Sequence, residues 1–489
     1  MKKTLTTTIL CALALAACST QTPPPKQAQK GGSTSTPTPT SAIAWAPCTD
    51  VQGPDGKTIN DPGMECAKLP VPLDYAAQGG EKIDLALVRI KATGAKQGSL
   101  VFNFGGPGGS GVDTLPLAKA LFAGLNSSYD LVSFDPRGVD RSAPVKCGDT
   151  EKYVSESFED DDKMAEQFVA DCQKDSAKVL PHLGTVNAAQ DLEQIRVAVG
   201  DDKLNYFGIS YGTHLGAVYA TKYPQKVGRF VLDAALDPTI TFEERAIAQT
   251  KGFKQAFEAF EKDCAARKCK LGGDVEPAVD KLIDQLEAKP LKVKDRELTA
   301  DLASTGIFAA LYAKQTWPLL EQGVTAAQQG DGTMLLLLAD SYTGRKPDGT
   351  YSTMMASMPA ISCLDSSERP DEATVDRVEQ ATEKIFPLVA SGGLGSICRH
   401  WPAKGSDEAK RIDATGSAPI VVVGGKGDPA TPYEWAPKLA AQLKTGVLLT
   451  YEGEGHGAYL SGSSCVTRAI DAYLLKGEVP QQNTTCPAA

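Results

Sequence analysis

Residues Gly208-Ile209-Ser210-Tyr211-Gly212 have the spacing of a turn that presents a catalytic serine. An apolar and aromatic run, 204–207, precedes them, and small or apolar residues suited to a packed helix follow. In such a strand–turn–helix unit the serine hydroxyl stands clear of the sheet, and the flanking glycines avoid collisions. A serine hydroxyl is a weak nucleophile without a base and oxyanion donors beside it. The rest of the chain must therefore supply those partners for Ser210.

The expected base is His456, and the expected acid is Asp428. His456 lies between two glycines just after the last predicted strand, so its loop can reach across the top of a sheet. Asp428 follows the predicted strand 419–424, at the strand end where parallel sheets place their chemistry. There it would orient the imidazole and stabilise its charged form. The order Ser210, Asp428, His456 is the order that α/β-hydrolases require.

Other titratable residues fit these roles less well. His214 lies four residues after the serine and is expected to pack on the following helix, away from the hydroxyl. His182 and His400 stand in irregular stretches and are expected to be structural or at the surface. Asp413 precedes its strand and so lies at the wrong edge of the sheet, and Glu454 is too close to the base in sequence to support it independently.

An oxyanion hole needs two backbone N–H groups near the nucleophile. Tyr211, the residue after the serine, supplies one by its position. The glycine-rich stretch 105–111 follows a short apolar run and is the candidate for the other, because glycine lets backbone N–H groups approach a substrate oxygen. A phosphate-binding loop is the rival interpretation, but the stretch lacks the Gly-Lys-Ser/Thr ending. A purely structural glycine turn is the second alternative.

The strand and helix pattern places these residues on an α/β fold. Short apolar strands alternate with helical stretches up to residue 238, which predicts a mostly parallel sheet covered by helices on both faces. The alternation stops over 239–413, where the spacing is mainly helical, including one stretch over 304–328. It resumes after residue 414 with two more strands. We therefore expect an α/β-hydrolase core in two segments, 45–238 and 414–489, around a helical cap.

The N-terminal residues are expected to direct export. Residues 1–17 combine a short basic start with an apolar stretch too short to span a bilayer, as in a signal peptide. They end in Leu-Ala-Ala before Cys18, which resembles a bacterial lipobox, so lipid attachment at Cys18 is predicted. An ordinary signal peptide with an incidental cysteine is the alternative. Residues 18–44 are rich in Pro, Thr, Ser and Gln and are expected to form a flexible tether on the outer face of the membrane.

The cysteine pattern agrees with an exported protein. Of 12 cysteines, Cys11 and Cys18 belong to the export segment, and the even number that remains predicts disulfides. Pairing of sequence neighbours is plausible, but sequence alone does not fix the connectivity. No Cys-x-x-Cys occurs and the four histidines do not cluster with cysteines, so no metal or other cofactor is expected. The neighbour pairs are Cys48–Cys66, Cys147–Cys172, Cys264–Cys269, Cys363–Cys398 and Cys465–Cys486.

The length and the net charge of the chain narrow the class of protein further. The chain has 489 residues, enough for two domains or for one domain with a large insertion. Its net charge is −10 and it has no basic stripe, which argues against a nucleic-acid partner. We expect a monomer that touches the membrane only through its lipid.

Two motifs resemble the prolyl-aminopeptidase family of α/β-hydrolases. Residues 104–108, Phe-Gly-Gly-Pro-Gly, resemble its His-Gly-Gly-Pro-Gly oxyanion motif, and residues 135–142 resemble its Asp-x-Arg-Gly-x-Gly-x-Ser turn. The lipobox and the stretches 360–365, 398–402 and 428–432 are similar to those of the secreted actinobacterial tripeptidyl aminopeptidases. The resemblance extends from about Trp45 to the end of the chain.

This resemblance implies an exopeptidase that releases short peptides from free N-termini. It implies Ser210, Asp428 and His456 as the catalytic triad, with the N–H groups of Gly106 and Tyr211 as oxyanion donors. It also favours a bridge between Cys363 and Cys398. Phe104 and Asp140 depart from the family motifs, which bears on specificity more than on mechanism. Asp135 and Arg137 are expected to form a buried structural ion pair.

An exopeptidase needs an anionic group for the ammonium of its substrate. Glu243, Glu244 and Asp365 are the candidates in or near the cap, although for any single one of them an ordinary solvated helix charge is the favoured explanation. A carboxylesterase with the same triad is the first alternative function, because specificity in such folds depends on the cap. A lipid-anchored binding protein with an inactive hydrolase fold is the second.

Overall fold

The computed structural model describes most of the chain beyond the export segment. The described residues are 43–489 except 54–55, 156–160, 273–274 and 389–392. Cys18, the predicted signal peptide 1–17 and nearly all of the predicted tether 18–44 lie outside the described residues. None of the helices within these described ranges is long and apolar enough to cross a membrane.

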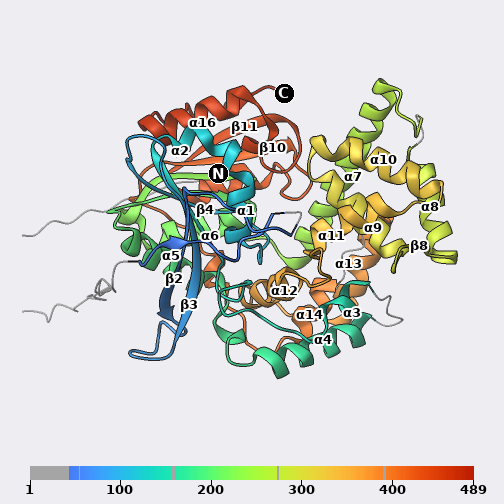
Figure 1. The fold of residues 1–489 in the computed structure, drawn as a ribbon, viewed down its shortest axis with the longest axis horizontal. Coiled ribbons are helices and arrows are strands. Elements are labelled where there is room, and N and C mark those ends of the chain that lie inside the picture. Colours follow the sequence, from blue (N-terminus) through green and yellow to red (C-terminus); the bar gives the residue numbers. More distant parts are fainter. Residues whose placement is uncertain (1–42, 54–55, 156–160, 273–274, 389–392) are drawn as a thin grey trace, which may run out of the picture. The chain divides into compact units, whose positions relative to one another are not determined.

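A ten-stranded sheet forms the centre of the fold (Figure 1), in the order β1-β2-β3-β5-β4-β6-β7-β10-β11-β12. From β5 to β12 all neighbours pair in parallel, whereas β1, β2, β3 and β5 pair antiparallel. The carboxyl ends of the parallel strands therefore meet at one edge. The strands are β1 (Ala46–Pro47), β2 (Met64–Pro72), β3 (Lys82–Ile90), β4 (Gly98–Asn103), β5 (Tyr129–Phe134), β6 (Leu204–Ile209), β7 (Val227–Asp233), β10 (Ile420–Gly427), β11 (Gly446–Glu454) and β12 (Thr484–Cys486).

Helices bury both faces of this sheet, which establishes the α/β-hydrolase fold predicted from the sequence. In β10, Ile420 and Val422 belong to one hydrophobic cluster and Val421 and Val423 to another, because successive side chains point to opposite faces. Helices α5, α6 and α15 complete the first cluster, and α1, α2 and α16 complete the second. These helices are α1 (Gly111–Ala118), α2 (Ala123–Asn126), α5 (Thr185–Val199), α6 (Tyr211–Lys222), α15 (Trp435–Leu443) and α16 (Ser464–Lys476).

Strand β2 is a feature that the sequence did not indicate, because prolines made residues 45–72 resemble a loop. Its full length pairs with β3, from Met64 opposite Ile90 to Pro72 opposite Lys82. On its other side β2 pairs with β1 only near Cys66. The prolines at positions 70 and 72 therefore stand where this strand has no outer neighbour, a place where a missing N–H costs no ladder bond.

The segment between β7 and β10 is mainly helical, as its sequence predicted, with one small hairpin that the helical pattern did not reveal. The hairpin pairs Leu291–Val293 (β8) with Arg296–Leu298 (β9). Two further helices, α3 and α4, lie between β5 and α5. The helices are α3 (Thr150–Ser155), α4 (Asp161–Ser176), α7 (Phe242–Arg267), α8 (Val275–Ala288), α9 (Ala300–Leu311), α10 (Trp317–Gln328), α11 (Thr333–Thr343), α12 (Met354–Leu364), α13 (Glu372–Ile385) and α14 (Gly393–His400).

These helices divide between two hydrophobic cores. Side chains of α7 to α11 form most of one cluster, in which Phe257, Leu302 and Leu335 are buried and which also includes Phe386 and Ala430. In contrast, Ala360 of α12 and Cys398 of α14 belong to the cluster that also covers the sheet. The segment 239–413 is therefore not one separately packed unit, since α12 and α14 share a core with the hydrolase sheet.

The predicted helical stretch 304–328 is broken into α9 and α10 (Figure 1). Pro318 stands in the first turn of α10, where a missing N–H is tolerated, whereas inside a continuous helix it would collide with the preceding turn. Ala313 is extended, with φ −143° and ψ 134°. The break at residues 312–316 leaves the carbonyl of Tyr312 without a helical partner and available to another segment.

The structure contains all five disulfides between neighbouring cysteines that the sequence made plausible. They join Cys48 to Cys66, Cys147 to Cys172, Cys264 to Cys269, Cys363 to Cys398 and Cys465 to Cys486.

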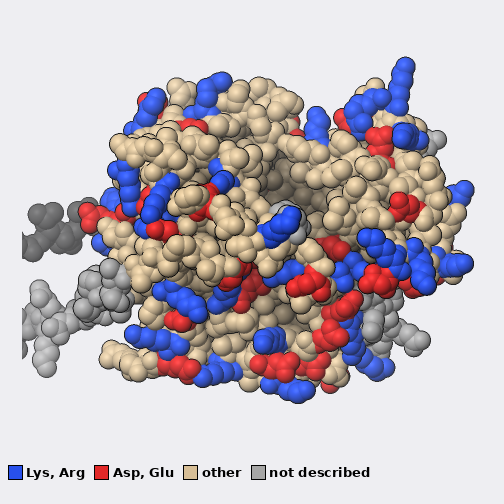
Figure 2. Space-filling model, viewed as in Figure 1, with Lys and Arg blue, Asp and Glu red and all other residues tan. Residues whose placement is uncertain are grey.

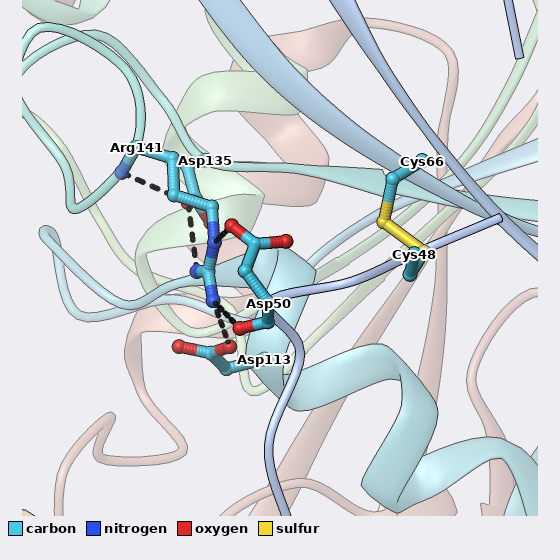
Figure 3. The surroundings of a disulfide bond; sticks show 6 residues. All are labelled: Cys48, Asp50, Cys66, Asp113, Asp135 and Arg141. Carbon is cyan, nitrogen blue, oxygen red and sulfur yellow. Dashed lines mark hydrogen bonds and ion pairs between the residues drawn. A yellow bond between two sulfur atoms is a disulfide. The ribbon is translucent and has the colours of Figure 1, made fainter. Parts of the chain in front are cut away.

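The expected ion pair between Asp135 and Arg137 is wrong, because each residue has another partner. Arg137 is fully buried and makes two 2.7 Å hydrogen bonds to Asp191 of α5. Asp135 accepts from Ser110 Oγ at 2.6 Å, and Arg141 lies 3.5 Å from it (Figure 3). The two residues are close in sequence but bond different parts of the fold, so sequence proximity did not predict the pairing.

Arg141 joins the N-terminal segment to the turn after β5. Its guanidinium lies 2.9 Å from the Asp50 carboxylate and 2.8 Å from the Asp113 carboxylate. Figure 3 shows these contacts, with the Cys48–Cys66 bridge on the far side of Asp50. Burial raises the pKa of Asp135 to about 6, although hydrogen bonds from Ser110 and the Val112 N–H favour its ionised form. This cluster fixes the start of α1, and hence the glycine-rich loop that leads into it.

The surface charges are mixed in sign. On the face shown in Figure 2, Lys and Arg side chains lie close to Asp and Glu side chains, and uncharged residues cover wide areas between these groups. This pattern agrees with the modest net charge of −10.

Candidate active site

Ser210 sits at the turn between β6 and α6, in the backbone conformation of a strained nucleophile turn. Its φ is 57° and its ψ is −123°, which is rare for a residue with a side chain. The flanking glycines permit this turn: a Cβ on Gly208 would lie 2.3 Å from the Gly212 oxygen, and one on Gly212 would lie 2.4 Å from the Asn103 oxygen. Ser210 Oγ lines a cavity and has no hydrogen-bond partner among the described residues.

Gly106 and Tyr211, the residues predicted to supply the oxyanion N–H groups, line the same cavity as Ser210. Tyr211 is the first residue of α6, so its N–H has no partner within the helix. In the glycine-rich loop, the N–H of Gly105 donates to Asn103 Oδ1 at 3.1 Å, whereas Gly106 and Pro107 line the cavity, and of these two only Gly106 has an N–H. The φ of Gly106 is 107°, a conformation open to glycine. The positive end of α6 adds to the attraction of negative charge at this place.

His456 and Asp428 form a hydrogen-bonded pair just after the ends of β11 and β10. His456 Nδ1 lies 2.8 Å and 3.0 Å from the two carboxylate oxygens of Asp428. Asp428 is buried and also accepts from the N–H groups of Ala430 and Thr431 and from the Thr431 hydroxyl. The carboxylate therefore holds Nδ1 of His456. This leaves Nε2 available to exchange a proton with the serine or the substrate.

The environment favours the protonated form of His456. Burial alone would lower its pKa, but the charge of Asp428 and its hydrogen bond outweigh burial, and the charge of Asp233 acts in the same direction. The net pKa of His456 therefore lies above its ordinary value of 6.5. An imidazole of this kind is a stronger base toward a serine proton than a free histidine.

Asp233, at the end of β7, links the histidine loop to the nucleophile turn. Its carboxylate accepts from the N–H groups of Ala458, at 3.0 Å, and Tyr459, at 2.8 Å, just after His456. Its carbonyl accepts from the Ser210 N–H at 3.0 Å. Burial raises the pKa of Asp233 to about 6, against the hydrogen bonds that favour its charge. This residue fixes the two loops relative to each other.

A cavity of about 180 Å³ opens from Ser210 between the sheet edge and the inserted helices. The Gly106–Pro107 loop and Tyr211 line it on the hydrolase side. The charged groups in its wall are Arg245, Asp365, Glu368 and Lys410. The main apolar side chains are Leu236, Pro238, Ile240, Phe242, Met358 and Leu394.

Asp365 lines this cavity and is connected to the residue after the nucleophile. It accepts from the N–H of Thr185 at 2.7 Å and from the Thr185 hydroxyl at 2.5 Å. The same hydroxyl lies 2.6 Å from the Tyr211 hydroxyl, which must then donate to it. Burial raises the pKa of Asp365 to about 6. A hydrogen-bond chain thus runs from the cavity carboxylate of Asp365 through Thr185 to the side chain of Tyr211.

The structure does not bring Glu243 and Glu244 to the cavity, which corrects the expectation that they could bind the substrate ammonium. Glu243 pairs with Arg377 at 3.0 Å on the outer face of α7. Glu244 accepts from the Thr241 N–H in a capping box at the start of α7. Both side chains complete local helix contacts, as acidic residues in a first helical turn commonly do.

Two of the other histidines, His214 and His400, and the acid Asp413 have partners outside the candidate triad. His214 lines the cavity and bonds the Ala409 carbonyl at 2.8 Å, and burial lowers its pKa to about 4. His400 bonds Asp162 at 2.9 Å. Asp413 is exposed and accepts from Thr415.

Several residues around the site were not found from the sequence. Asp233 is the last residue of one of the apolar strands predicted before residue 238. An acid at that strand end is a sequence signal that could have indicated a residue near the site. Arg245 and Tyr312 line the cavity, and Thr185 bonds the cavity residue Asp365; only the folded chain brings these positions together. Within the described part of the chain, no group of three or more His, Cys, Asp or Glu side chains is arranged to hold a metal ion.

Comparison with known proteins gives the family. A family model described as "TAP-like protein" matches residues 387–486. Serine protease Hip1 of Mycobacterium tuberculosis is 37% identical over 91% of each chain, and Carboxylesterase B of the same species is 33% identical over 86% of each chain. Tripeptidyl aminopeptidase of Streptomyces lividans is 30% identical over 86% of this chain and 83% of its own. The chain therefore belongs to the tripeptidyl-aminopeptidase-like family of α/β-hydrolases.

Proposed function

We propose that this protein is an extracellular serine aminopeptidase that releases short peptides, of three residues, from free N-termini. The observation that carries the proposal is the cavity that holds Ser210 together with the carboxylates of Asp365 and Glu368. A carboxylate in a cavity closed by inserted helices is suited to an ammonium group that has lost its water. The relatives named serine protease and tripeptidyl aminopeptidase support the peptidase activity and the length of the released peptide.

The reaction proceeds through an acyl-enzyme. His456 Nε2 takes the proton of Ser210 Oγ, and the oxygen attacks the peptide carbonyl. The N–H groups of Gly106 and Tyr211 donate to the oxyanion, while Asp428 stabilises the imidazolium. The imidazolium then gives its proton to the leaving amine as the C–N bond breaks. Water, deprotonated by His456, attacks the ester and releases the peptide, and Ser210 regains its proton.

A peptide panel tests this activity against the esterase alternative, which the relative named Carboxylesterase B supports. We expect cleavage of free-amino tripeptide amides, and N-acetylation should lower kcat/KM more than about thirtyfold, since an unpaired buried charge costs about 2–5 kcal/mol. Asp365→Asn should reduce this selectivity, whereas Glu243→Gln, outside the cavity, is the matched control. Turnover of short acyl esters without cleavage of free-amino peptides would contradict the proposal.

A fluorophosphonate probe separates an enzyme from an inactive binding protein. The probe should label the wild-type protein at Ser210 and leave Ser210→Ala unlabelled. Absence of labelling, or equal labelling of both proteins, would support the non-catalytic alternative.

The location and the division of the chain are part of the same proposal. Cys18 carries a lipid on the outer face of the membrane, and residues 18–44 form a tether. The hydrolase core is formed by residues 45–238 and 414–489. The helical segment 239–413 restricts access to this core. The five disulfides support an oxidising compartment. Incorporation of labelled palmitate into the full chain, and its loss in Cys18→Ala, tests the anchor. Equal labelling of both proteins would exclude Cys18 as the attachment site.

A further inference from the structure

Arg245 lies on the face of α7 that lines the cavity. Phe242, Arg245 and Gln249 are three and four residues apart, so they share one side of the helix, and all three contribute to the cavity wall. This places a guanidinium in the same cavity as Ser210, between the sheet edge and the inserted helices.

The two neighbours of Arg245 on this face form hydrogen bonds, whereas the Arg245 side chain has no such partner among the described residues. The Phe242 N–H donates to Glu368 Oε2 at 3.0 Å, and Gln249 Nε2 donates to the Ala430 carbonyl at 2.8 Å. The Arg245 side chain forms no hydrogen bond or ion pair with any of the described residues. Burial lowers its pKa, and only the more distant charges of Asp365, Asp237 and Glu368 oppose this effect.

Other arginines show what a guanidinium needs when it leaves water. Arg137 satisfies its donors with Asp191 and backbone carbonyls, and Arg369 donates to four carbonyls, including those of Cys363 and Ala403. A guanidinium carries five N–H donors in a planar fork that matches a carboxylate. Arg245 presents this fork to the cavity with the donors unused.

The charges around the cavity leave room for one more anion beside Arg245. Lys410 pairs with Asp407 at 3.4 Å, and Asp365 is held by Thr185. If a substrate ammonium binds at the carboxylates Asp365 and Glu368, Arg245 loses part of the negative field that stabilises it. A peptide that brings both an ammonium and a carboxylate would restore the balance.

We propose that Arg245 binds the carboxylate of an Asp or Glu side chain in the released part of the peptide. The substrates are then peptides with a free N-terminus and an acidic residue among the residues before the scissile bond. This inference rests on the proposed aminopeptidase activity and adds the substrate class to it. A fork of two charge-assisted hydrogen bonds discriminates between a carboxylate and the amide of the same shape.

The first experiment compares free-amino tripeptide amides that carry Glu or Gln at each of the three positions in turn. At one position the Glu peptide should exceed the Gln peptide about tenfold in kcat/KM, which corresponds to about 1.4 kcal/mol. In Arg245→Gln this ratio should fall to about one, and Arg245→Lys should keep part of it. Arg377→Gln, a charge removal on the outer side near α7, is the matched control and should keep the full ratio. Thermal melting verifies that each variant is folded.

A binding experiment separates this inference from the proposed activity. Calorimetry with Ser210→Ala should show about tenfold tighter binding of the Glu tripeptide than of the Gln tripeptide, and adding Arg245→Gln should abolish the difference. Selective binding without turnover in the wild-type protein would refute the aminopeptidase activity and keep the anionic subsite. Three outcomes would overturn the role of Arg245. The first is no preference for Glu at any position, and the second is a preference that survives in Arg245→Gln. The third is an equal loss of kcat/KM on all peptides in Arg245→Gln.

Discussion

The backbone N–H of His456 donates to the carbonyl of Tyr312 at 2.7 Å, so the histidine loop is bonded to the inserted helical segment. The rings of the two residues meet edge to face, with centroids 5.4 Å apart and planes at 81°. Tyr312 also lines the cavity. The segment that encloses the substrate space therefore also helps to place the proposed catalytic base.

Removal of the Tyr312 ring should impair the chemical step. We expect Tyr312→Ala to lower kcat about two- to tenfold, since an edge contact between rings is worth about 0.5–1.5 kcal/mol. Tyr312→Phe keeps the ring and should retain most of kcat. Steady-state kinetics on one free-amino peptide measures both variants. If Tyr312→Phe were as impaired as Tyr312→Ala, the hydroxyl and not the ring contact would be the important group.

The pH profile should report the raised pKa of His456. Only neutral imidazole accepts the Ser210 proton, so kcat/KM should rise with pH through a midpoint above 6.5. Asp428→Asn removes the charge that raises this pKa; it should move the midpoint down and lower kcat about 10⁴-fold. His400→Gln changes a histidine bonded to Asp162 and should leave the midpoint unchanged. A midpoint that does not move in Asp428→Asn would contradict the proposed pair.

The chain from Asp365 through Thr185 to Tyr211 should affect turnover more than binding of the ground state. Thr185→Val removes the central hydroxyl and leaves the Tyr211 hydroxyl and Asp365 short of a partner, at a cost of about 1–3 kcal/mol. We expect a lower kcat with a smaller change in KM, and recovery in Thr185→Ser. Loss of stability without any change in kcat would show that the chain is only structural.

Asp233 should be important for both the fold and the reaction. Asp233→Asn can place an NH₂ group against the N–H groups of Ala458 and Tyr459, which weakens the tie between the histidine loop and β7. We expect a lower melting temperature and a lower kcat. Asp130, a buried acid near the start of β5 and three strands away from β7, is the control: Asp130→Asn should lower the melting temperature alone, because its partners Ala92 and Lys96 lie outside the cavity.

The bridge between Cys363 and Cys398 should influence substrate affinity. It joins α12 to α14, and both helices line the cavity. Replacing both cysteines with alanine opens a closed loop with a separation of 35 residues and should destabilise the fold by about 2–4 kcal/mol. KM should rise as well. The Cys48 and Cys66 pair gives the matched double variant, which should lose stability with little change in KM.

The sheet and the candidate triad were predictable because each depends on local patterns. Strand, turn and helix signals around Ser210, and strand ends before Asp428 and His456, put these residues at one edge of a parallel sheet. The cavity was less predictable, because its wall is built from helices whose mutual packing has no short sequence pattern. Glu243 illustrates this limit, since its position on α7 directs it to Arg377, while Arg245 two residues later faces the cavity.

The Cys48–Cys66 bridge also determines how a mechanical load enters the protein. A pull on the chain from its N-terminal side reaches Cys48 before Asp50, which bonds Arg141 next to the glycine-rich loop. The covalent bond passes the tension to β2, whose nine residue pairs with β3 share it along the sheet edge. The segment at Asp50 then carries no tension, so the glycine-rich loop is shielded from a pull on the N-terminal end.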